Sequence, residues 1–194
     1  LLTVQGTHPD GRPISTIHFV SGGFGALHGL DGRDCLPGPS NMAAVPVEIW
    51  ESITGMSVLS KKMIPDSGGA GEFRGGVGQE VTLRNDTGKP MTVLSMGNRT
   101  EFAAPGYNKG KPGALREHQI NGKTINPKGA HVLAPLDTIT LRQAGGGGIG
   151  DPRMREKKKI KRDLALGLVS KEGAERDYGS VSYTHLRAHE TSID

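Results

Sequence analysis

Residues 66–78 read Asp66-Ser67-Gly68-Gly69-Ala70-Gly71-Glu72-Phe73-Arg74-Gly75-Gly76-Val77-Gly78. Six glycines in this stretch let the backbone adopt positive φ and approach a ligand or another chain segment more closely than side chains permit. Asp66 can bond the amides that follow and fix the turn, while the planar guanidinium of Arg74 suits a carboxylate, a phosphate or a backbone carbonyl. Two interpretations are open: a loop that binds a ligand, and a glycine-rich crossover inside a β domain.

The composition indicates one domain with many tight turns. The chain has 194 residues, of which 30 are glycine and 12 are proline, so we expect short strands. Only 34% of the residues are hydrophobic and 4% are aromatic, so the core must rest on Val, Ile, Leu and Met. A core with so few hydrophobic residues indicates that the chain packs against a partner.

Charge and cysteine content exclude several classes of protein. Residues 151–162 carry seven basic and two acidic side chains, so this segment is +5 and the rest of the chain −1. The basicity therefore belongs to one predicted helix, and no nucleic-acid surface is expected. The single Cys35 excludes an intrachain disulfide and fits a reducing compartment. No apolar run is long enough for a membrane span, so we expect a cytoplasmic protein without membrane contact.

Alternating hydrophobicity predicts a series of short strands. They cover residues 1–5, 16–20, 45–51, 58–64, 79–84, 91–95 and 136–141. The turn at residues 85–88 predicts a hairpin between strands 79–84 and 91–95. Asn121-Gly122 predicts a second hairpin over residues 118–125, because this pair suits a type I′ turn.

Beyond residue 150 the hydrophobic period changes to that of a helix. Asp151 and Pro152 predict a helix start, and Ile160, Leu164 and Leu168 form a stripe expected to dock on the sheet. Ser170 predicts the cap of a second helix, with Val169 and Ala174 as a hydrophobic staple and Tyr178-Gly179 at its end. The predicted fold class is α+β, mainly β, with short antiparallel strands, Gly-rich loops and two short C-terminal helices. Residues 182–194 match no period and look like a non-native tail, so the domain is expected to cover residues 1–181.

The sequence holds no specific cofactor motif. Residues 145–150 fit G-x-G-x-x-G, but the preceding strand alternates, Asp151 would oppose a pyrophosphate and no ribose-binding acid follows, which favours a structural role. Residues 106–111 are not followed by the Ser or Thr of a Walker A loop. The seven histidines lack zinc-site spacing; His8 with Asp10, or His28 with Asp31, could contribute to a composite site, although ordinary surface histidines are the simpler interpretation. The 157–162 run could touch phosphates or form the solvated face of an amphipathic helix, and its apolar stripe favours the latter.

Several motifs follow one another in a characteristic order. They are Gly22-Gly23-Phe24-Gly25-Ala26 with Asp31-Gly32; Pro46-Val47-Glu48 with Glu51; Pro65 to Gly71 with Arg74 to Gly78; Gly110-Lys111-Pro112-Gly113; Gly145 to Pro152; and Gly167 to Ser170 with Asp177-Tyr178-Gly179. Together they resemble the C-terminal part of the hydantoinase B/5-oxoprolinase family, over residues 6–181. Ala44-Val45 stand where many members carry Asn-Thr, which leaves the substrate subgroup open.

This resemblance implies part of an ATP-dependent amidohydrolase subunit that opens a hydantoin, 5-oxoproline or another small cyclic amide, together with an A-type subunit. It implies ATP and a divalent metal in the full complex, although neither is bound by a recognisable motif in this chain, and an inactive isolated fragment. No catalytic residue is assigned. A phosphorylated, anionic intermediate would suit a substrate-binding loop made by Asp66, Ser67, Gly68, Gly69, Arg74, Gly75 and Gly76, with Arg74 as anion contact and Asp66 as turn anchor.

Two alternatives remain open. The related ATP-dependent ketone carboxylases share the scaffold, and assays of ring opening against ketone-dependent bicarbonate fixation would separate the two activities. A non-catalytic domain that docks the A-type partner is also compatible with the glycine loops. Fold-level analogy does not choose the substrate.

Overall fold

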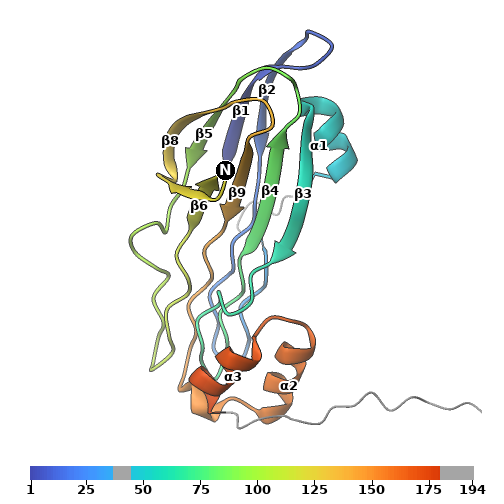
Figure 1. Cartoon of the computed structure of the whole chain (residues 1–194). Coiled ribbons are helices and arrows are strands. Elements are labelled where there is room, and N and C mark those ends of the chain that lie inside the picture. The colour runs from blue at the N-terminus through green and yellow to red at the C-terminus, as the bar shows by residue number, and fades with distance from the viewer. Residues whose placement is uncertain (37–44, 180–194) are drawn as a thin grey trace, which may run out of the picture.

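The computed structural model describes residues 1–36 and 45–179, and Figure 1 shows three parts arranged along one long axis. Two β-sheets with helix α1 form one end, extended segments without regular strand pairing form the middle, and helices α2 and α3 lie at the other end. The tail expected at residues 182–194 and the motif position Ala44 lie outside the described residues.

The strands form two antiparallel sheets, as the predicted mainly β, α+β class requires. The first sheet has the order β2 (Pro13–His18), β1 (Leu2–Thr7), β5 (Met91–Met96), β8 (Lys128–Leu133). The second has the order β3 (Met56–Met63), β4 (Gln79–Asn85), β9 (Thr138–Arg142), β6 (Glu117–Ile120), β7 (Lys123–Ile125). The hairpin β6–β7 is confirmed, with Asn121 and Gly122 both at positive φ.

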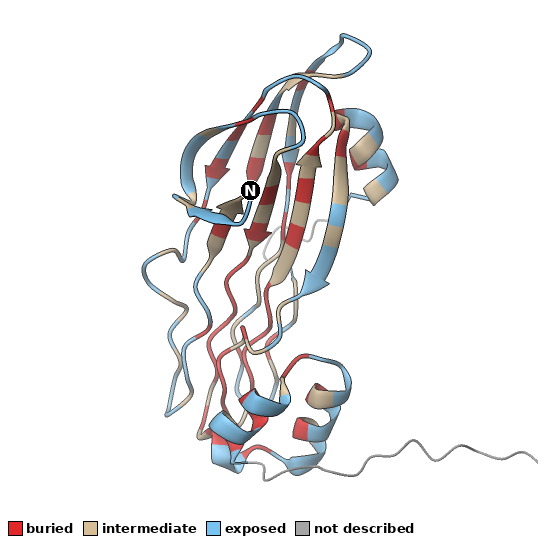
Figure 2. Cartoon of the chain, in the orientation of Figure 1, coloured by how far each residue is buried: buried red, intermediate tan, exposed pale blue. Residues whose placement is uncertain are grey.

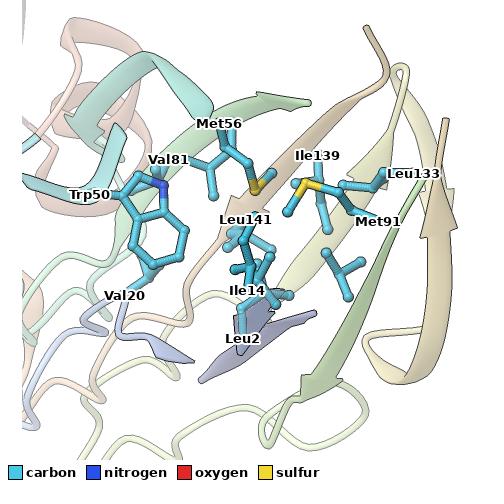
Figure 3. Packing of buried hydrophobic residues seen from close by; sticks show 13 residues of the cluster. Leu2, Ile14, Val20, Trp50, Met56, Val81, Met91, Leu133, Ile139 and Leu141 are labelled. Atoms are coloured by element: carbon cyan, nitrogen blue, oxygen red, sulfur yellow. The ribbon is translucent and has the colours of Figure 1, made fainter. Parts of the chain in front are cut away.

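The core lies between the two sheets (Figure 3). Leu2, Val93 and Leu133 of the first sheet face Val81, Ile139 and Leu141 of the second, and all six are at most 1% exposed. Trp50 closes one side of this core and packs its ring 4.3 Å from that of His18. The aliphatic composition of the core is thus as expected from the sequence.

The strand predicted at residues 45–51 is wrong, because the segment forms helix α1 (Val47–Thr54). The alternation of Val45, Val47 and Ile49 is too short to distinguish the two periods. Pro46 stands at the N-cap, and Trp50 and Thr54, four residues apart, form the buried face. Burial of Trp50 against the sandwich therefore outweighs the strand propensity of the β-branched residues.

The hairpin predicted between residues 79–84 and 91–95 is also wrong, because β4 and β5 belong to different sheets. Asn85 ends β4, and its side-chain amide donates hydrogen bonds to the carbonyls of Lys89, Leu133 and Ala134 at 2.8, 3.0 and 3.1 Å. Its Oδ1 accepts hydrogen bonds from the N–H and hydroxyl of Thr87. These bonds hold the turn as a crossover from one sheet to the other.

The C-terminal helices lie away from the sandwich. Asp151 caps the short 3₁₀ helix η1 (Pro152–Met154), and α2 (Lys157–Ala165) begins after it. The expected docking of the Ile160, Leu164 and Leu168 stripe on the sheet is wrong, because Ile160 packs with Ala70, Val169, Ala174 and Tyr178, and Leu168 lies beyond α2. Helix α3 (Lys171–Tyr178) is confirmed with its Ser170 cap, Val169/Ala174 contact and left-handed Gly179.

Candidate functional site

The glycine-rich motifs meet in the middle of the molecule, in a set of extended segments that we call the glycine bundle. It comprises segments 22–35, 67–78, 104–114 and 143–150, which run side by side between the sandwich and the C-terminal helices (Figure 1). Figure 2 shows that much of this region is buried, although few large side chains are present.

Residues 145–148 form the central segment of the glycine bundle. A Cβ on Gly145, Gly146, Gly147 or Gly148 would lie 1.7, 2.0, 1.9 or 2.4 Å from the carbonyl oxygen of Ser67, Phe24, Pro105 or Gly69, respectively. Gly145 and Gly148 thus face the same segment, while the two glycines between them face two others. This repeat of three residues per turn is that of a polyproline II helix, so each side of the central segment packs on a different neighbour.

Backbone hydrogen bonds join these segments around the centre. The N–H of Gly69 donates to Gly146, that of Gly146 to Gly76 and that of Gly76 to Phe24, at 2.8, 2.9 and 2.8 Å. Because the bonds of one segment point to several neighbours, the segments form a bundle and not a sheet. Buried amides and carbonyls are thereby satisfied without side chains.

The predicted substrate-binding loop is part of this packing. A Cβ on Gly68, Gly69, Gly75 or Gly76 would come within 2.1 Å of a carbonyl oxygen of Gly75, Lys111, Gly146 or Arg33, respectively. Ser67 is 2% exposed; its hydroxyl donates to the Ile64 carbonyl and accepts from the N–H of Gly78. The close approach of these residues is therefore to the protein's own backbone.

Arg74 is buried in ion pairs. Its side chain is 3% exposed, and its terminal nitrogens donate to both carboxylate oxygens of Asp34 at 3.0 and 3.3 Å, while Nε lies 3.5 Å from Asp163 Oδ2. Burial lowers the pKa of Arg74, but its hydrogen bonds to Asp34 and the nearby carboxylates outweigh burial and raise it overall. Arg74 is therefore a permanent cation whose charge is already balanced within the chain.

Arg155 forms the second half of the same cluster. Its side chain is fully buried and donates to Asp31 at 2.7 and 2.9 Å, to Asp163 at 2.6 Å and to the Glu72 carbonyl at 3.0 Å. The Tyr178 ring lies 5.9 Å from its guanidinium carbon. Burial opposes ionisation of Asp31, yet its bonds to Arg155 and to the N–H of Arg74 lower the pKa of Asp31 overall. We call Asp31, Asp34, Arg74, Arg155 and Asp163 the arginine–aspartate cluster.

Sequence reasoning missed the roles of Arg155, Asp34 and Asp163. In the sequence Arg155 contributes only to the net charge of residues 151–162. Its neighbours Arg153 and Glu156 are exposed, whereas Arg155 is 3% exposed. Asp31-Gly32 belongs to the first of the family-like motifs, and this is the one local sign in the sequence that Asp31 has a special role. The pairing partners are up to 124 residues apart, so no spacing rule reveals them.

Asp66 anchors helix α3. It adopts a left-handed conformation with φ of 59°, and its Oδ1 accepts a hydrogen bond from the N–H of Ser170 at 2.9 Å. Its own N–H donates to the Leu168 carbonyl. The predicted turn anchor thus ties the glycine bundle to the C-terminal helices, in addition to starting the loop.

Residues 1–36 and 45–179 do not fit ATP or a divalent metal. No group of three or more His, Cys, Asp or Glu side chains in these ranges could hold a metal ion. The three aspartates of the cluster are engaged by arginines, and the amides of Gly146 and Gly148 already donate to carbonyls, so they form no phosphate cradle. His8 pairs with Asp10 at 2.8 Å, and His28 contacts Phe73. No helix within the same ranges could cross a membrane.

The chain is a mainly β protein of two parts: a β-sandwich, and a glycine bundle that is held together by backbone contacts and by the arginine–aspartate cluster. Residues 1–152 match the family described as Hydantoinase B/oxoprolinase. The chain belongs to this family, and the glycine-rich motifs among those that carried the resemblance form the bundle.

Individual relatives differ in activity. The chain is 30% identical over 175 residues to caprolactamase subunit beta of Pseudomonas jessenii, covering 84% of this chain and 30% of that protein. It is 26% identical over 211 residues to the acetone carboxylase alpha subunit of Xanthobacter autotrophicus, covering 85% of this chain and 27% of that protein. The crystal structure of the ATP-dependent caprolactamase from Pseudomonas jessenii has the same fold, with a TM-score of 0.80 at 23% identity over 98% of this chain and 35% of that chain. The chain thus spans about three tenths of the length of these relatives.

Proposed function

We propose that this chain is part of the B-type subunit of an ATP-dependent enzyme that opens a small cyclic amide together with an A-type subunit. The family match over residues 1–152 carries this proposal, and the similarity to caprolactamase subunit beta supports a cyclic-amide substrate. Opening an unstrained amide ring is thermodynamically unfavourable, so coupling to ATP would drive such a reaction. The single cysteine supports a cytoplasmic location.

Within such an enzyme, the chain's own contribution is a rigid support. We infer that Asp66, Ser67, Gly68, Gly69, Arg74, Gly75 and Gly76 hold the substrate site in place from within the glycine bundle. Their burial and their bonds to the chain's own backbone support this role over direct substrate contact. ATP, the metal ion and the reacting groups would then bind to other parts of the subunit and to the A-type partner.

The decisive experiment uses the complete B-type subunit with its A-type partner. We expect ATP-dependent opening of 5-oxoproline, a hydantoin or caprolactam, measured by product formation together with phosphate release. The absence of any ring opening in a folded complex would contradict the proposal.

Arg74→Ala in that complex tests the support role. Removing Arg74 leaves Asp34 and Asp163 with less charge compensation, so we expect turnover to fall by orders of magnitude together with the thermal midpoint. A loss of turnover with an unchanged thermal midpoint would show instead that Arg74 contacts the substrate. Wild-type turnover in this variant would contradict both roles.

Ketone carboxylation is the second candidate function, and the similarity to the acetone carboxylase alpha subunit favours it. The same complex, supplied with acetone, bicarbonate and ATP, distinguishes the two reactions by which substrate is consumed. A non-catalytic docking role would be favoured if the chain bound the A-type partner tightly while Arg74→Ala left turnover intact.

A further inference from the structure

The outer face of the first sheet carries a row of exposed apolar side chains beside the polar, uncharged Thr3, Gln5, Ser15 and Thr92. Ile17, Leu94, Met96 and Val132 lie on this face with 44%, 40%, 57% and 65% exposure, and Phe19 follows β2 with 43%. In β5 the alternate residues Met91, Val93 and Ser95 point inward and are buried. These exposed side chains are therefore not a part of the sandwich core.

The apolar residues are adjacent across the sheet. Thr3 of β1 pairs with Ile17 of β2 on one side and with Leu94 of β5 on the other. Leu94 in turn pairs with Ala130 of β8, and Val132 pairs with Thr92. Residues that pair across antiparallel strands have Cβ atoms about 5 Å apart, so the exposed groups form one continuous surface. We call it the β5 face.

The outer face of the second sheet provides an internal comparison. Its paired positions are Glu80 with Arg142, Thr82 with Thr140, and Gln119 with Thr140. Glu80 also forms ion pairs with Lys62 and Arg142. One sandwich therefore presents a charged, hydrated face and an apolar face, and contiguous apolar surface of this kind marks an interaction site.

We propose that the β5 face is covered by the remaining part of the B-type subunit's own polypeptide. This chain spans 30% of the length of caprolactamase subunit beta, so most of such a subunit lies outside the matched region. Within β1, β2, β5 and β8 the only charged outward-facing residue is Lys128, opposite Met96 at the end of the sheet. Interfaces between separately folded partners carry polar rims, whereas permanent interfaces resemble a core cut in half. The face therefore suits a permanent contact within one subunit better than a reversible one.

The test measures whether the β5 face is accessible in the complete B-type subunit. In a Cys35→Ser background, Leu94→Cys places one thiol at the centre of the face. Arg142→Cys is the matched control, because its side chain is 40% exposed on a central strand of the other sheet. We expect a maleimide to label Leu94→Cys at least about tenfold more slowly than Arg142→Cys in the complete subunit. Both variants should be labelled at similar rates in the 194-residue chain alone.

A second measurement uses charge. Leu94→Lys would bury an unpaired ammonium in the complete subunit and lower its thermal midpoint by roughly 5 °C or more, but would leave the 194-residue chain within about 1 °C of wild type. Val132→Lys should behave in the same way, whereas Thr140→Lys should be tolerated in both.

Three results would overturn the proposal. They are rapid labelling of Leu94→Cys in the complete subunit, protection that appears only when the A-type subunit is added, and protection of the 194-residue chain that increases with its own concentration. A gene that encodes no further part of a B-type subunit would do the same. The proposal rests on family membership and not on the proposed activity, and labelling needs neither ATP nor substrate. Failure of the proposal on the β5 face is therefore distinguishable from failure of the proposed ring-opening activity.

Discussion

The guanidinium of Arg155 and the carboxylate of Asp31, separated by 124 residues, form two hydrogen bonds of 2.7 and 2.9 Å in the buried arginine–aspartate cluster. Asp163 accepts a third bond from the same guanidinium. The cluster thereby joins the first glycine segment, the 66–78 loop and helix α2. Removing one partner leaves the others charged and poorly solvated.

Arg155→Met should destabilise the chain by about 3 to 5 kcal/mol, because the buried Asp163 and the partly buried Asp31 lose their nearest counter-ion. For a chain of this size the thermal midpoint should fall by roughly 10 °C. Arg153→Met, two residues away at an exposed position, is the control and should shift the midpoint by about 1 °C or less. Equal midpoints for the two variants would show that the cluster contributes no net stability.

Gly146→Ala should prevent the glycine bundle from closing. The new Cβ would lie 2.0 Å from the Phe24 carbonyl oxygen. Because this oxygen belongs to the backbone, it cannot move aside by a change of rotamer, as a side-chain atom could. The expected cost exceeds about 4 kcal/mol, seen as loss of cooperative thermal unfolding. Gly25→Ala is a matched control in the same bundle, since the nearest atom to its Cβ would be at 3.9 Å. A Gly146→Ala variant as stable as Gly25→Ala would contradict the packing described for residues 145–148.

Asn85→Ala should loosen the crossover between the two sheets. The substitution removes the Asn85 side chain as partner of the buried Leu133 carbonyl and of the buried N–H of Thr87, at a cost of about 3 kcal/mol. Chemical denaturation should show this loss at an unchanged slope with denaturant concentration. Asn98→Ala, at an exposed position, should have little effect.

Stability should fall in acid because of two buried histidines. Burial, together with nearby positive charges, lowers the pKa of His18 and of His118 to about 4. Both are neutral in the folded chain, whereas an unfolded histidine takes up a proton below pH about 6.5. The free energy of unfolding should therefore be constant above that pH and decrease from pH 6.5 to 4, by up to about 1.4 kcal/mol per pH unit for each histidine.

His118→Gln should remove about half of this pH dependence while retaining a polar partner for Ser95, which lies 2.9 Å from His118 Nδ1. Thermal unfolding followed by circular dichroism between pH 4 and 8 provides the measurement. Parallel curves for wild type and His118→Gln would exclude a role for this group.

Local sequence signals predicted the parts of the fold that depend on local contacts. Asn121-Gly122 predicted its hairpin, and Ser170, Ala174 and Gly179 predicted α3 with both ends, because these turns and caps satisfy neighbouring backbone groups. Helix α1 and the crossover at Asn85 were missed because Trp50 and Asn85 find their partners in distant strands. Strand β8 was not predicted either.

In the candidate site, too, the features set by local sequence were predicted and those set by distant contacts were not. The sequence identified residues 66–78 as a place of close approach, but it cannot distinguish a ligand from the chain's own backbone, since glycine serves both. The contacts of Gly69 with Lys111 and of Gly75 with Gly146 join residues tens of positions apart and support the backbone interpretation, whereas substrate contact by this loop stays a prediction. The pairing of Arg74 with Asp34 and Asp163 is equally non-local.

The central position of residues 145–148 also determines the order in which the molecule can assemble. Segments 22–35, 67–78 and 104–114 all contact this last-made segment, so the hydrogen bonds that they share with it cannot form until it leaves the ribosome. Contacts of such long sequence separation also form slowly. The centre of the glycine bundle is therefore completed late in synthesis, and a product truncated before residue 145 would lack it permanently.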